Sequence, residues 1–207
     1  MKTTEYRQTL RYKILDVAMA AFHENGIVAV SMDSIARKLA ISKRTLYELY
    51  ANKEELLLEG MRRYDEQHES HLSAFQEGHN VIEVVAEYYR LLIKDEANVS
   101  PTFYADIHRY SRLVVYFEER RIAHQTATRE FFLRGVKDGF FRGDVDFDVT
   151  SVLGEAFVRH FMQTEMYKHY SMSHIFRNVV FVCIKGICTA KGAAELDMLL
   201  AENAKKP

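Results

Sequence analysis

An all-α fold is predicted by three features of the amino-acid sequence. Two prolines and nine glycines among 207 residues are too few for an all-β chain, which needs many turns. Apolar residues recur at helical spacing along most of the chain. A hydrophobic content of 48% is enough for a large buried core, and the length allows one large domain with or without a small appendage. We therefore expect a bundle of helices.

Three closely spaced helices are predicted near the N-terminus. From Leu10 the apolar spacing indicates a helix that ends at Asn25-Gly26, a pair that tolerates the left-handed conformation of a helix C-terminus. Ser31 is placed to cap a short second helix, and Ser42 to cap a third over 43–50. The tight turn between these two predicts a helix-turn-helix, whose second helix fits a DNA major groove roughly 12 Å wide. A capped helical hairpin with a purely structural role has the same spacing.

The charge of the chain is divided unevenly. Residues 1–53 hold nine Lys or Arg against five Asp or Glu, whereas the whole chain has a net charge of −1. The first 53 residues are therefore basic and the remainder is acidic. Since Lys and Arg supply most of the sequence-independent affinity for DNA by neutralising phosphates, this division favours a nucleic-acid-binding head.

A longer fourth helix is predicted from Asn52, where Glu55 completes a capping box. No linker interrupts it, so we expect it to run from the head directly into the rest of the chain. Helical stretches beyond the head are predicted at 53–78, 80–97, 101–108, 109–138, 147–168, 173–189 and 192–203. No apolar run is long enough to cross a bilayer and the first residues lack a secretory signal, so a cytoplasmic protein is expected.

Of the two last long helices, 149–161 carries an apolar stripe, and 172–187 is apolar around much of its circumference. A partner subunit would cover them, although 172–188 has an alternative interpretation as a central helix of the monomer core. The candidate dimer-interface residues are Phe157, Phe161, Phe176, Val180, Cys183, Ile184 and Ile187. The two cysteines, Cys183 and Cys188, suit neither a disulfide nor a zinc site, and we interpret both as small buried apolar residues.

Aromatic side chains gather in the middle of the sequence. Such residues line apolar pockets that bind small molecules, and they also occur as plain core residues. The candidate ligand-pocket residues are Tyr64, His68, Tyr88, Tyr89, Phe103, Tyr104 and Phe117.

The segment VSMDSIARKLAISKRTLYELYANKEELL, residues 30–57, resembles the N-terminal signature of the TetR family of bacterial transcriptional regulators. The resemblance includes the SK-x-TLY core, an aromatic residue at Tyr50 and the KEEL that begins the fourth helix. It implies a DNA-binding domain over 1–52 and a helical ligand-binding and dimerisation domain over 53–207. It also implies a four-helix dimer interface made by the last two long helices and their mates.

Roles for single residues follow from the same resemblance. Arg44 is the candidate base-reading residue, because a guanidinium donates two hydrogen bonds to guanine O6 and N7. Ser31, Tyr47 and Lys53 are candidate phosphate contacts, and Lys43 and Thr45 are candidates for either role. The DNA-binding residues implied are Ser31, Ser42, Lys43, Arg44, Thr45, Tyr47 and Lys53.

Two positions depart from the family pattern. Ala40 stands at a turn position where glycine is common, and a left-handed conformation there would cost roughly 1 kcal/mol because of the Cβ atom. Glu48 stands where an aromatic residue or histidine is common. An acid near phosphates repels DNA unless it accepts from a cytosine amine or pairs with a neighbouring cation.

The predicted function is a ligand-responsive transcriptional regulator, acting as a repressor that binds a near-palindromic duplex operator as a homodimer and is released by an unknown small molecule. No cofactor, metal or catalytic residue is expected. One alternative is a helical-bundle metalloenzyme, for which the sequence offers Asp65-x-x-His68 without a second copy at that spacing. The other is a ligand sensor or scaffold whose head no longer binds DNA.

Overall fold

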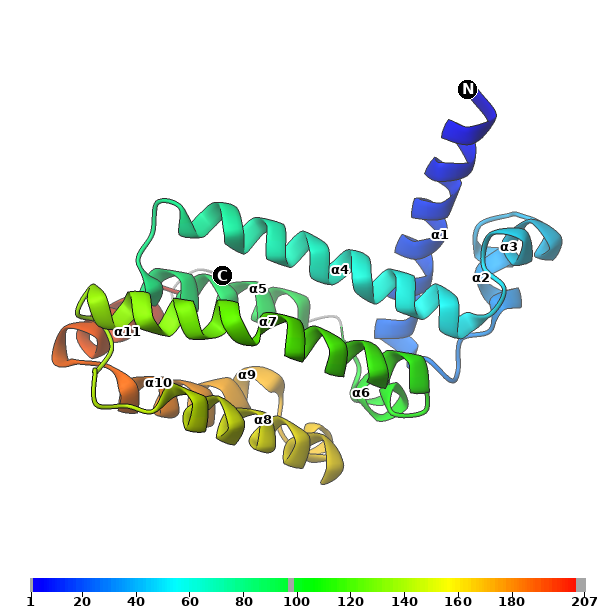
Figure 1. The fold of residues 1–207 in the computed structure, drawn as a ribbon. Helices are drawn as coiled ribbons and strands as arrows, with labels where there is room; N and C mark the ends of the chain where they lie inside the picture. Colours follow the sequence, from blue (N-terminus) through cyan, green and yellow to red (C-terminus); the bar gives the residue numbers. More distant parts are fainter. Residues whose placement is uncertain (1, 97–98, 204–207) are drawn as a thin grey trace. The chain divides into compact units, whose positions relative to one another are not determined.

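The computed structural model describes residues 2–96 and 99–203, and these residues are helical with short connections (Figure 1). The only strand-like pairing among them is an isolated bridge between Phe141 and Cys188. The all-α prediction is therefore confirmed. The chain forms two compact units: unit 1 is Met1–His68 with Asn98–Arg120, and unit 2 is Glu69–Ala97 with Arg121–Pro207. These units are a division by packing, distinct from the functional division at residue 52 that the sequence predicts.

Unit 1 contains the predicted head together with parts of later helices. Its complete helices are α1 (Lys2–Asn25), α2 (Met32–Lys38), α3 (Lys43–Leu49) and α6 (Pro101–Ile107), and it also holds the first parts of α4 (Lys53–Gln76) and α7 (Ser111–Lys137). The α4 helix is continuous through the boundary between the units, as the absence of a linker predicts. The α1 helix begins well before Leu10, the first residue of the apolar pattern.

The predicted caps of α2 and α3 are confirmed. The Ser31 hydroxyl accepts from the Ser34 N–H at 3.1 Å, and the Ser34 hydroxyl accepts from the Ser31 N–H at 3.1 Å, which completes a capping box. The Ser42 hydroxyl accepts from the Thr45 N–H at 3.0 Å. Each cap satisfies a backbone donor that the first turn of a helix leaves free, so both helices start where the sequence sets them.

The turn between α2 and α3 holds a left-handed residue at Ala40, the condition under which the sequence implies a steric cost for its Cβ atom. Ala40 has φ +52°. Its N–H donates to the Arg37 carbonyl at 3.1 Å, and the following Ile41 N–H donates to the Ala36 carbonyl at 3.1 Å. These bonds close the end of α2 and compensate for the steric cost of the Cβ atom.

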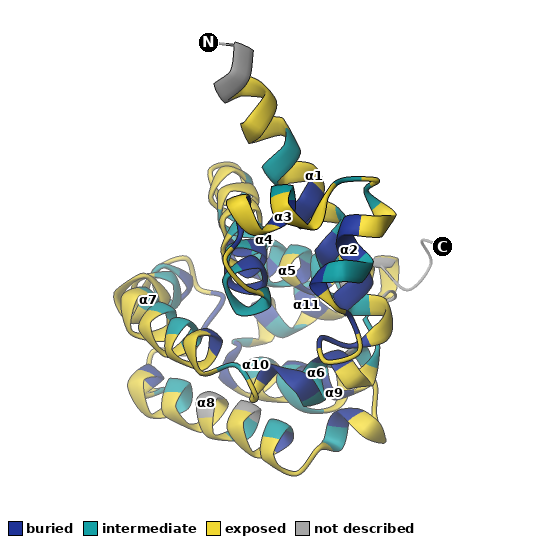
Figure 2. Ribbon diagram, turned by 90° about the vertical axis from the view of Figure 1, so that its right-hand side faces the viewer, coloured by how far each residue is buried: buried dark blue, intermediate teal, exposed yellow. Residues whose placement is uncertain are grey.

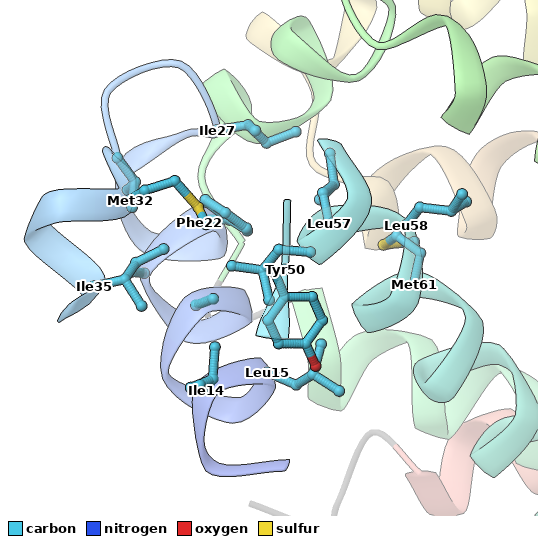
Figure 3. Close-up of a cluster of buried hydrophobic side chains, with 14 of the residues drawn as sticks. Ile14, Leu15, Phe22, Ile27, Met32, Ile35, Tyr50, Leu57, Leu58 and Met61 are labelled. Atoms are coloured by element: carbon cyan, nitrogen blue, oxygen red, sulfur yellow. The ribbon is translucent and has the colours of Figure 1, made fainter. Parts of the chain in front are cut away.

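Tyr50 anchors the end of α3 in the core of unit 1 (Figure 3). Its ring is fully buried, and its hydroxyl donates to Glu59 Oε1 at 3.1 Å. The Arg11 guanidinium lies 4.7 Å from the ring centroid, is ion-paired with Glu59 and donates to the Leu49 carbonyl at 3.1 Å. Burial and the neighbouring Glu59 carboxylate raise the pKa of the Tyr50 hydroxyl, which therefore stays a neutral donor. Helices α1, α3 and α4 are joined at this one side chain.

Unit 2 contains the remaining helices. They are α5 (Val81–Glu96), α8 (Phe147–Gln163), a 3₁₀ turn (Met166–Lys168), α9 (Met172–Ile175), a π-helical segment (Phe176–Val180), α10 (Phe181–Ile187) and α11 (Ala190–Asn203). The expected single helix over 147–168 is wrong, because the chain turns at Glu165, which has φ +54°. Among the described residues no helix is long and apolar enough to span a membrane.

The two cysteines of unit 2 differ in environment. Cys188 is buried, as predicted, and burial raises the pKa of its thiol to about 11. Cys183 is exposed on α10, so the prediction of a buried side chain is wrong for this residue. The residues one turn away, Val179 and Ile187, are partly buried and buried, so apolar spacing alone does not report the exposure of Cys183.

Glu87 on α5 is the centre of a charge cluster in unit 2. Its carboxylate accepts from Arg90 Nε at 2.7 Å and from Arg90 Nη2 at 2.6 Å, and it lies 2.6 Å from His71 Nε2 on α4. The Glu87 side chain is only 10% exposed. The Arg90 hydrogen bonds, aided by His71, hold the pKa of Glu87 at about 2, below its ordinary value of 4.5.

Replacing Glu87 by glutamine is expected to lower the free energy of unfolding by about 2 kcal/mol at pH 7. The folded-state pKa lies below the unfolded one, so this contribution is complete above pH 4.5 and is lost as the pH falls towards 2. Urea unfolding at pH 7 and at pH 3 measures it, with Glu66→Gln, an exposed acid of α4, as the matched control. An equal difference between Glu87→Gln and the unsubstituted protein at both pH values would contradict the assignment.

Candidate nucleic-acid interface

The α3 helix presents one apolar and one polar face, and its polar face is in solvent (Figure 2). Leu46 and Leu49 are buried in the core of unit 1. The exposed residues of the segment are Ser42, Lys43, Arg44, Tyr47 and Glu48. A short helix held by a buried face and capped at its start is rigid enough to present these side chains to a ligand as one surface.

The polar side chains in the first turn of α3 are partly engaged with the head itself. Lys43 is ion-paired with Asp33 of α2. The Ser42 and Thr45 hydroxyls lie 2.8 Å apart in a shared hydrogen bond, while Ser42 also caps the helix. These three predicted DNA-binding residues therefore have roles in holding α3 on α2 and in starting the helix.

Arg44 and Glu48 form an ion pair one turn apart on the exposed face. Arg44 Nε donates to Glu48 Oε1 at 2.8 Å. The Arg44 side chain is 90% exposed and the Glu48 side chain is 52% exposed. Arg44 is thus the neighbouring cation considered for Glu48, the acid that departs from the family pattern, and it offsets part of the Glu48 charge.

Lys53 begins α4, but its ammonium is engaged with the loop between α1 and α2. Nζ donates to the Ile27 carbonyl at 2.8 Å, to the Val30 carbonyl at 2.9 Å and to the Val28 carbonyl at 3.3 Å. Burial lowers the pKa of this ammonium, and the Asp106 carboxylate opposes that shift. An ammonium has three donor hydrogens, so these carbonyls account for all of them. In this geometry the Lys53 ammonium is occupied by the loop and has no donor left for the expected phosphate contact.

The same loop is held from the other side by α6. Asp106 Oδ2 accepts from the Val28 N–H at 2.7 Å, although Asp106 is almost fully buried. Gly26 has φ +83°, and a Cβ atom there would lie 2.9 Å from Thr102 Oγ1 and 3.1 Å from Asp106 Oδ2. The loop thus needs glycine both for its conformation and for the close approach of α6. Sequence reasoning missed this contact, since no local pattern links residues 28 and 106.

Two cations outside the predicted set lie next to the turn of the helix-turn-helix. Arg37 and Lys38 are exposed in the last turn of α2. Two of the predicted phosphate contacts are exposed: Ser31, at the start of α2, and Tyr47, which is 48% exposed on α3. The basic composition of residues 1–53 was the signal that could have added Arg37 and Lys38 to the site.

The predicted ligand-pocket residues are divided between the two units. Phe103 is buried in the core of unit 1, where its ring meets that of His23 edge-on at 4.6 Å, and Tyr104 and Phe117 pack against the same core. Tyr64 and His68 are partly buried in α4, with ring centroids 4.2 Å apart. Tyr88 and Tyr89 belong to unit 2. Phe103 therefore fits the alternative interpretation, that of a core residue.

Tyr89 is likewise a core residue of its unit. Its ring packs edge-on against Phe181 at 4.6 Å, and its hydroxyl accepts from Arg177 Nε at 2.7 Å. Tyr88, by contrast, is 46% exposed and lies 6.1 Å from the Phe176 ring.

The predicted dimer-interface residues differ in their exposure. Phe161 and Ile187 are buried within unit 2 itself, so they have little surface left for a partner. Phe157, Phe176, Val180 and Ile184 are partly buried, and Cys183 is exposed. Among the described residues of α8 and α10, the large apolar side chains in solvent are Val149, Val152, Leu153 and Val182. We call Val149, Val152 and Leu153 the α8 stripe.

The Asp65-x-x-His68 pair has a structural role in unit 1. The buried Asp65 carboxylate accepts from the Tyr116 hydroxyl at 2.8 Å and pairs with Arg120 at 3.2 Å. The His68 ring packs against that of Tyr64 at an interplanar angle of 30°. The carboxylate that the metalloenzyme alternative needs is thus committed to partners on α7.

Comparison with known proteins finds similarity to bacterial transcriptional regulators. Residues 14–59 match the model of bacterial regulatory proteins, tetR family. The HTH-type transcriptional repressor KstR2 of Mycobacterium tuberculosis is 25% identical over 162 residues, covering 67% of this chain and 72% of the repressor. The family match includes α2, α3 and the start of α4, the elements that build the exposed face described above.

Solved structures agree on the fold. The ketosteroid transcriptional regulator KstR2 of Mycobacterium tuberculosis has a TM-score of 0.57 at 21% identity and covers 86% of this chain and 95% of its own. The fatty acid degradation regulator FadR of Bacillus halodurans has a TM-score of 0.61 at 15% identity and covers 84% and 94%. Over residues 14–59 the chain is similar to bacterial regulatory proteins of the tetR family, its fold is shared with solved transcriptional regulators, and it is a ligand-responsive DNA-binding transcriptional regulator.

Proposed function

We propose that the protein is a cytoplasmic repressor that binds a near-palindromic duplex operator as a homodimer and leaves it when a small molecule binds. The observation that supports this most is the exposed guanidinium of Arg44 on a helix whose other face is buried. In a helix-turn-helix the first residues of the second helix reach base edges in the major groove, and Arg44 occupies such a position.

Within this proposal the head residues have three kinds of role. Arg44 reads a base, while Ser31 and Tyr47 contact phosphates through their hydroxyls and set the register of the head on the duplex. Lys43, Ser42 and Thr45 hold and start α3, and Lys43 turns to DNA only where the phosphates compete with Asp33. We assign Lys53 to holding the α1–α2 loop, and Arg37 and Lys38 to the phosphate contacts.

Homodimerisation through α8 and α10 would bring two heads together. Two heads related by a two-fold axis reach successive major grooves about 34–36 Å apart, which is the reason to expect a near-palindrome. The α8 stripe supports this assignment, because Val152 is 62% exposed and Leu153 is 65% exposed in the single chain. Apolar side chains of this size gain free energy when a partner removes them from water.

Introducing a carboxylate into the α8 stripe is expected to break the dimer. In Val152→Glu the charge would be buried without a partner, which raises the dimer dissociation constant by at least about 10-fold. Sedimentation velocity over a concentration series measures it. Val115→Glu on α7, at a site that is 55% exposed, is the matched control and is expected to stay dimeric. A monomeric unsubstituted protein, or a Val152→Glu protein as dimeric as the control, would refute this interface.

The ligand would act on the head through helices of unit 1. Because α4 carries Lys53 and α6 carries Asp106, a displacement of either helix moves the loop that precedes α2. A coupling free energy of about 1–3 kcal/mol lowers operator affinity roughly 5- to 150-fold. The names of the ketosteroid and fatty acid degradation regulators favour an apolar small molecule as the ligand class.

A selection from random duplexes tests the proposal as a whole. The full-length protein is incubated with the library at moderate salt, and bound duplexes are sequenced. We expect an enriched motif with two inverted half-sites whose centres are about one helical turn, or a multiple of it, apart. Recovery without any enriched motif would favour the alternative of a sensor whose head has lost DNA binding.

A further inference from the structure

Arg44 differs from the other polar residues of α3 in the donors that it has left to offer. Lys43 is paired with Asp33, and the Ser42 and Thr45 hydroxyls are bonded to each other. Arg44 uses its Nε–H for Glu48. A guanidinium has five N–H donors, so the four on Nη1 and Nη2 stay available, and they have no other acceptor within the described part of the chain.

The Arg44–Glu48 hydrogen bond constrains a side chain that is otherwise free in solvent. An exposed arginine loses conformational entropy when it is ordered on a target, and a prior contact that selects one arrangement reduces this loss. The guanidinium is planar, so fixing the Nε–H also fixes the plane and the direction of the two terminal nitrogens. Guanine presents O6 and N7 in the major groove, spaced to accept two parallel hydrogen bonds from such a pair.

Glu48 also acts on binding that does not depend on sequence. Its side chain is 52% exposed on the face that carries Arg44, so its charge repels the phosphate backbone. The repulsion weakens every DNA complex, whereas the ordered guanidinium strengthens only the complex with a guanine in the right place. Specificity is the difference between the affinity for the duplex with that guanine and the affinity for other duplexes. Glu48 increases this difference because it weakens every complex and strengthens only the one with the guanine.

We propose that Glu48 is a positioning residue that orders the Arg44 guanidinium for a guanine and so sets the base preference of α3. This inference rests on the proposed function, because it assumes that α3 enters a major groove. Glu48 itself does not touch the base. A direct contact from Glu48 to a cytosine amine is the competing arrangement, and it predicts a different result in the double variant below.

The test uses the duplex selected by the unsubstituted full-length protein and three copies in which the guanine assigned to Arg44 is replaced by each other base pair. A bidentate arginine contact gives roughly 5- to 150-fold preference for guanine. In Glu48→Ala we expect this preference to fall about 2- to 10-fold, the range set by the cost of ordering one side chain. Affinity for a random-sequence duplex is expected to rise in the same variant, because a negative charge is removed.

Three further variants separate a positioning role from a direct base contact and from a change in net charge. Glu48→Gln keeps an acceptor for Arg44 Nε and is expected to retain an intermediate preference. Arg44→Ala combined with Glu48→Ala is expected to show the same base preference as Arg44→Ala alone, since Glu48 acts through Arg44. Glu66→Ala, at an exposed acid on α4, controls for the change in net charge, and circular dichroism controls for the folding of each variant.

The outcomes distinguish this inference from the function on which it rests. If the unsubstituted protein selects no motif, the proposed function fails before any variant is compared. If a motif is selected but Glu48→Ala keeps the full guanine preference, the positioning role is wrong. If Glu48→Ala still removes a preference in the Arg44→Ala background, Glu48 reads a base itself, and the inference is overturned.

Discussion

Replacing Arg44 by alanine is expected to lower the affinity for the selected duplex roughly 5- to 150-fold and to remove the preference for one base in each half-site. The guanidinium is 90% exposed and keeps its terminal donors free, while the helix that carries it is fixed by buried Leu46 and Leu49. Truncation at Cβ removes the donors without a loss of core contacts. Fluorescence anisotropy with the selected duplex and its single-base variants measures both effects.

Arg37→Ala is the matched control for Arg44→Ala. Arg37 is an exposed arginine of the same head, and we assign it to a phosphate. Its loss is expected to lower the affinity for all duplexes by a similar factor. The slope of log affinity against log salt is expected to become less steep by about the contribution of one phosphate contact. An Arg44→Ala protein that keeps the selected base preference and only weakens all duplexes equally would show that the two arginines have the same role and that the base contact is misassigned.

Replacing Lys53 by methionine is expected to lower the free energy of unfolding by about 2 kcal/mol, the range for hydrogen bonds to a charged group. Methionine keeps the apolar stem of the side chain but leaves the carbonyls of Ile27 and Val30 without the ammonium donor. Because the ammonium is engaged with the loop, the salt dependence of DNA binding is expected to stay the same. Thermal and urea unfolding measure the first effect, and binding over a salt series measures the second.

Lys38→Met separates the stability effect from the electrostatic one. Lys38 is exposed at the end of α2, so its loss is expected to change stability little and to flatten the salt dependence by about one phosphate. The opposite pattern, a stable Lys53→Met protein whose binding is less sensitive to salt, would restore the phosphate contact that the sequence implies for Lys53.

Much of the head could be predicted from the sequence because its determinants are local. Ser31 and Ser42 cap helices through hydrogen bonds that reach three residues along the chain. The left-handed turn at Ala40 is closed by backbone hydrogen bonds that Ala40 and Ile41 donate to the carbonyls of Arg37 and Ala36. Short-range contacts of this kind recur wherever the same residues stand at the same spacing, so a motif over residues 30–57 reports them reliably.

The candidate interfaces of the rest of the chain could be predicted only in part. The apolar period along α8 and α10 identifies which side chains share a helix face. It does not report how much of that face the chain covers itself, and so Phe161 and Ile187 are buried in unit 2 while Val152 and Cys183 are in solvent. The aromatic residues chosen for a pocket are divided in the same way, with Phe103 and Tyr89 in the cores of different units.

The sequence by itself determined the helical class of this protein, the caps and turn of its helix-turn-helix and the family that its N-terminal segment resembles. The tertiary structure decided the partners of the functional side chains: Lys53 with the loop before α2, Asp106 with Val28, and Arg44 left open beside Glu48. The physical reason is the range of the interactions. Helix caps and apolar periods are fixed by neighbours within a few residues, whereas the partner of a buried charge is set by segments that meet only when the chain has folded.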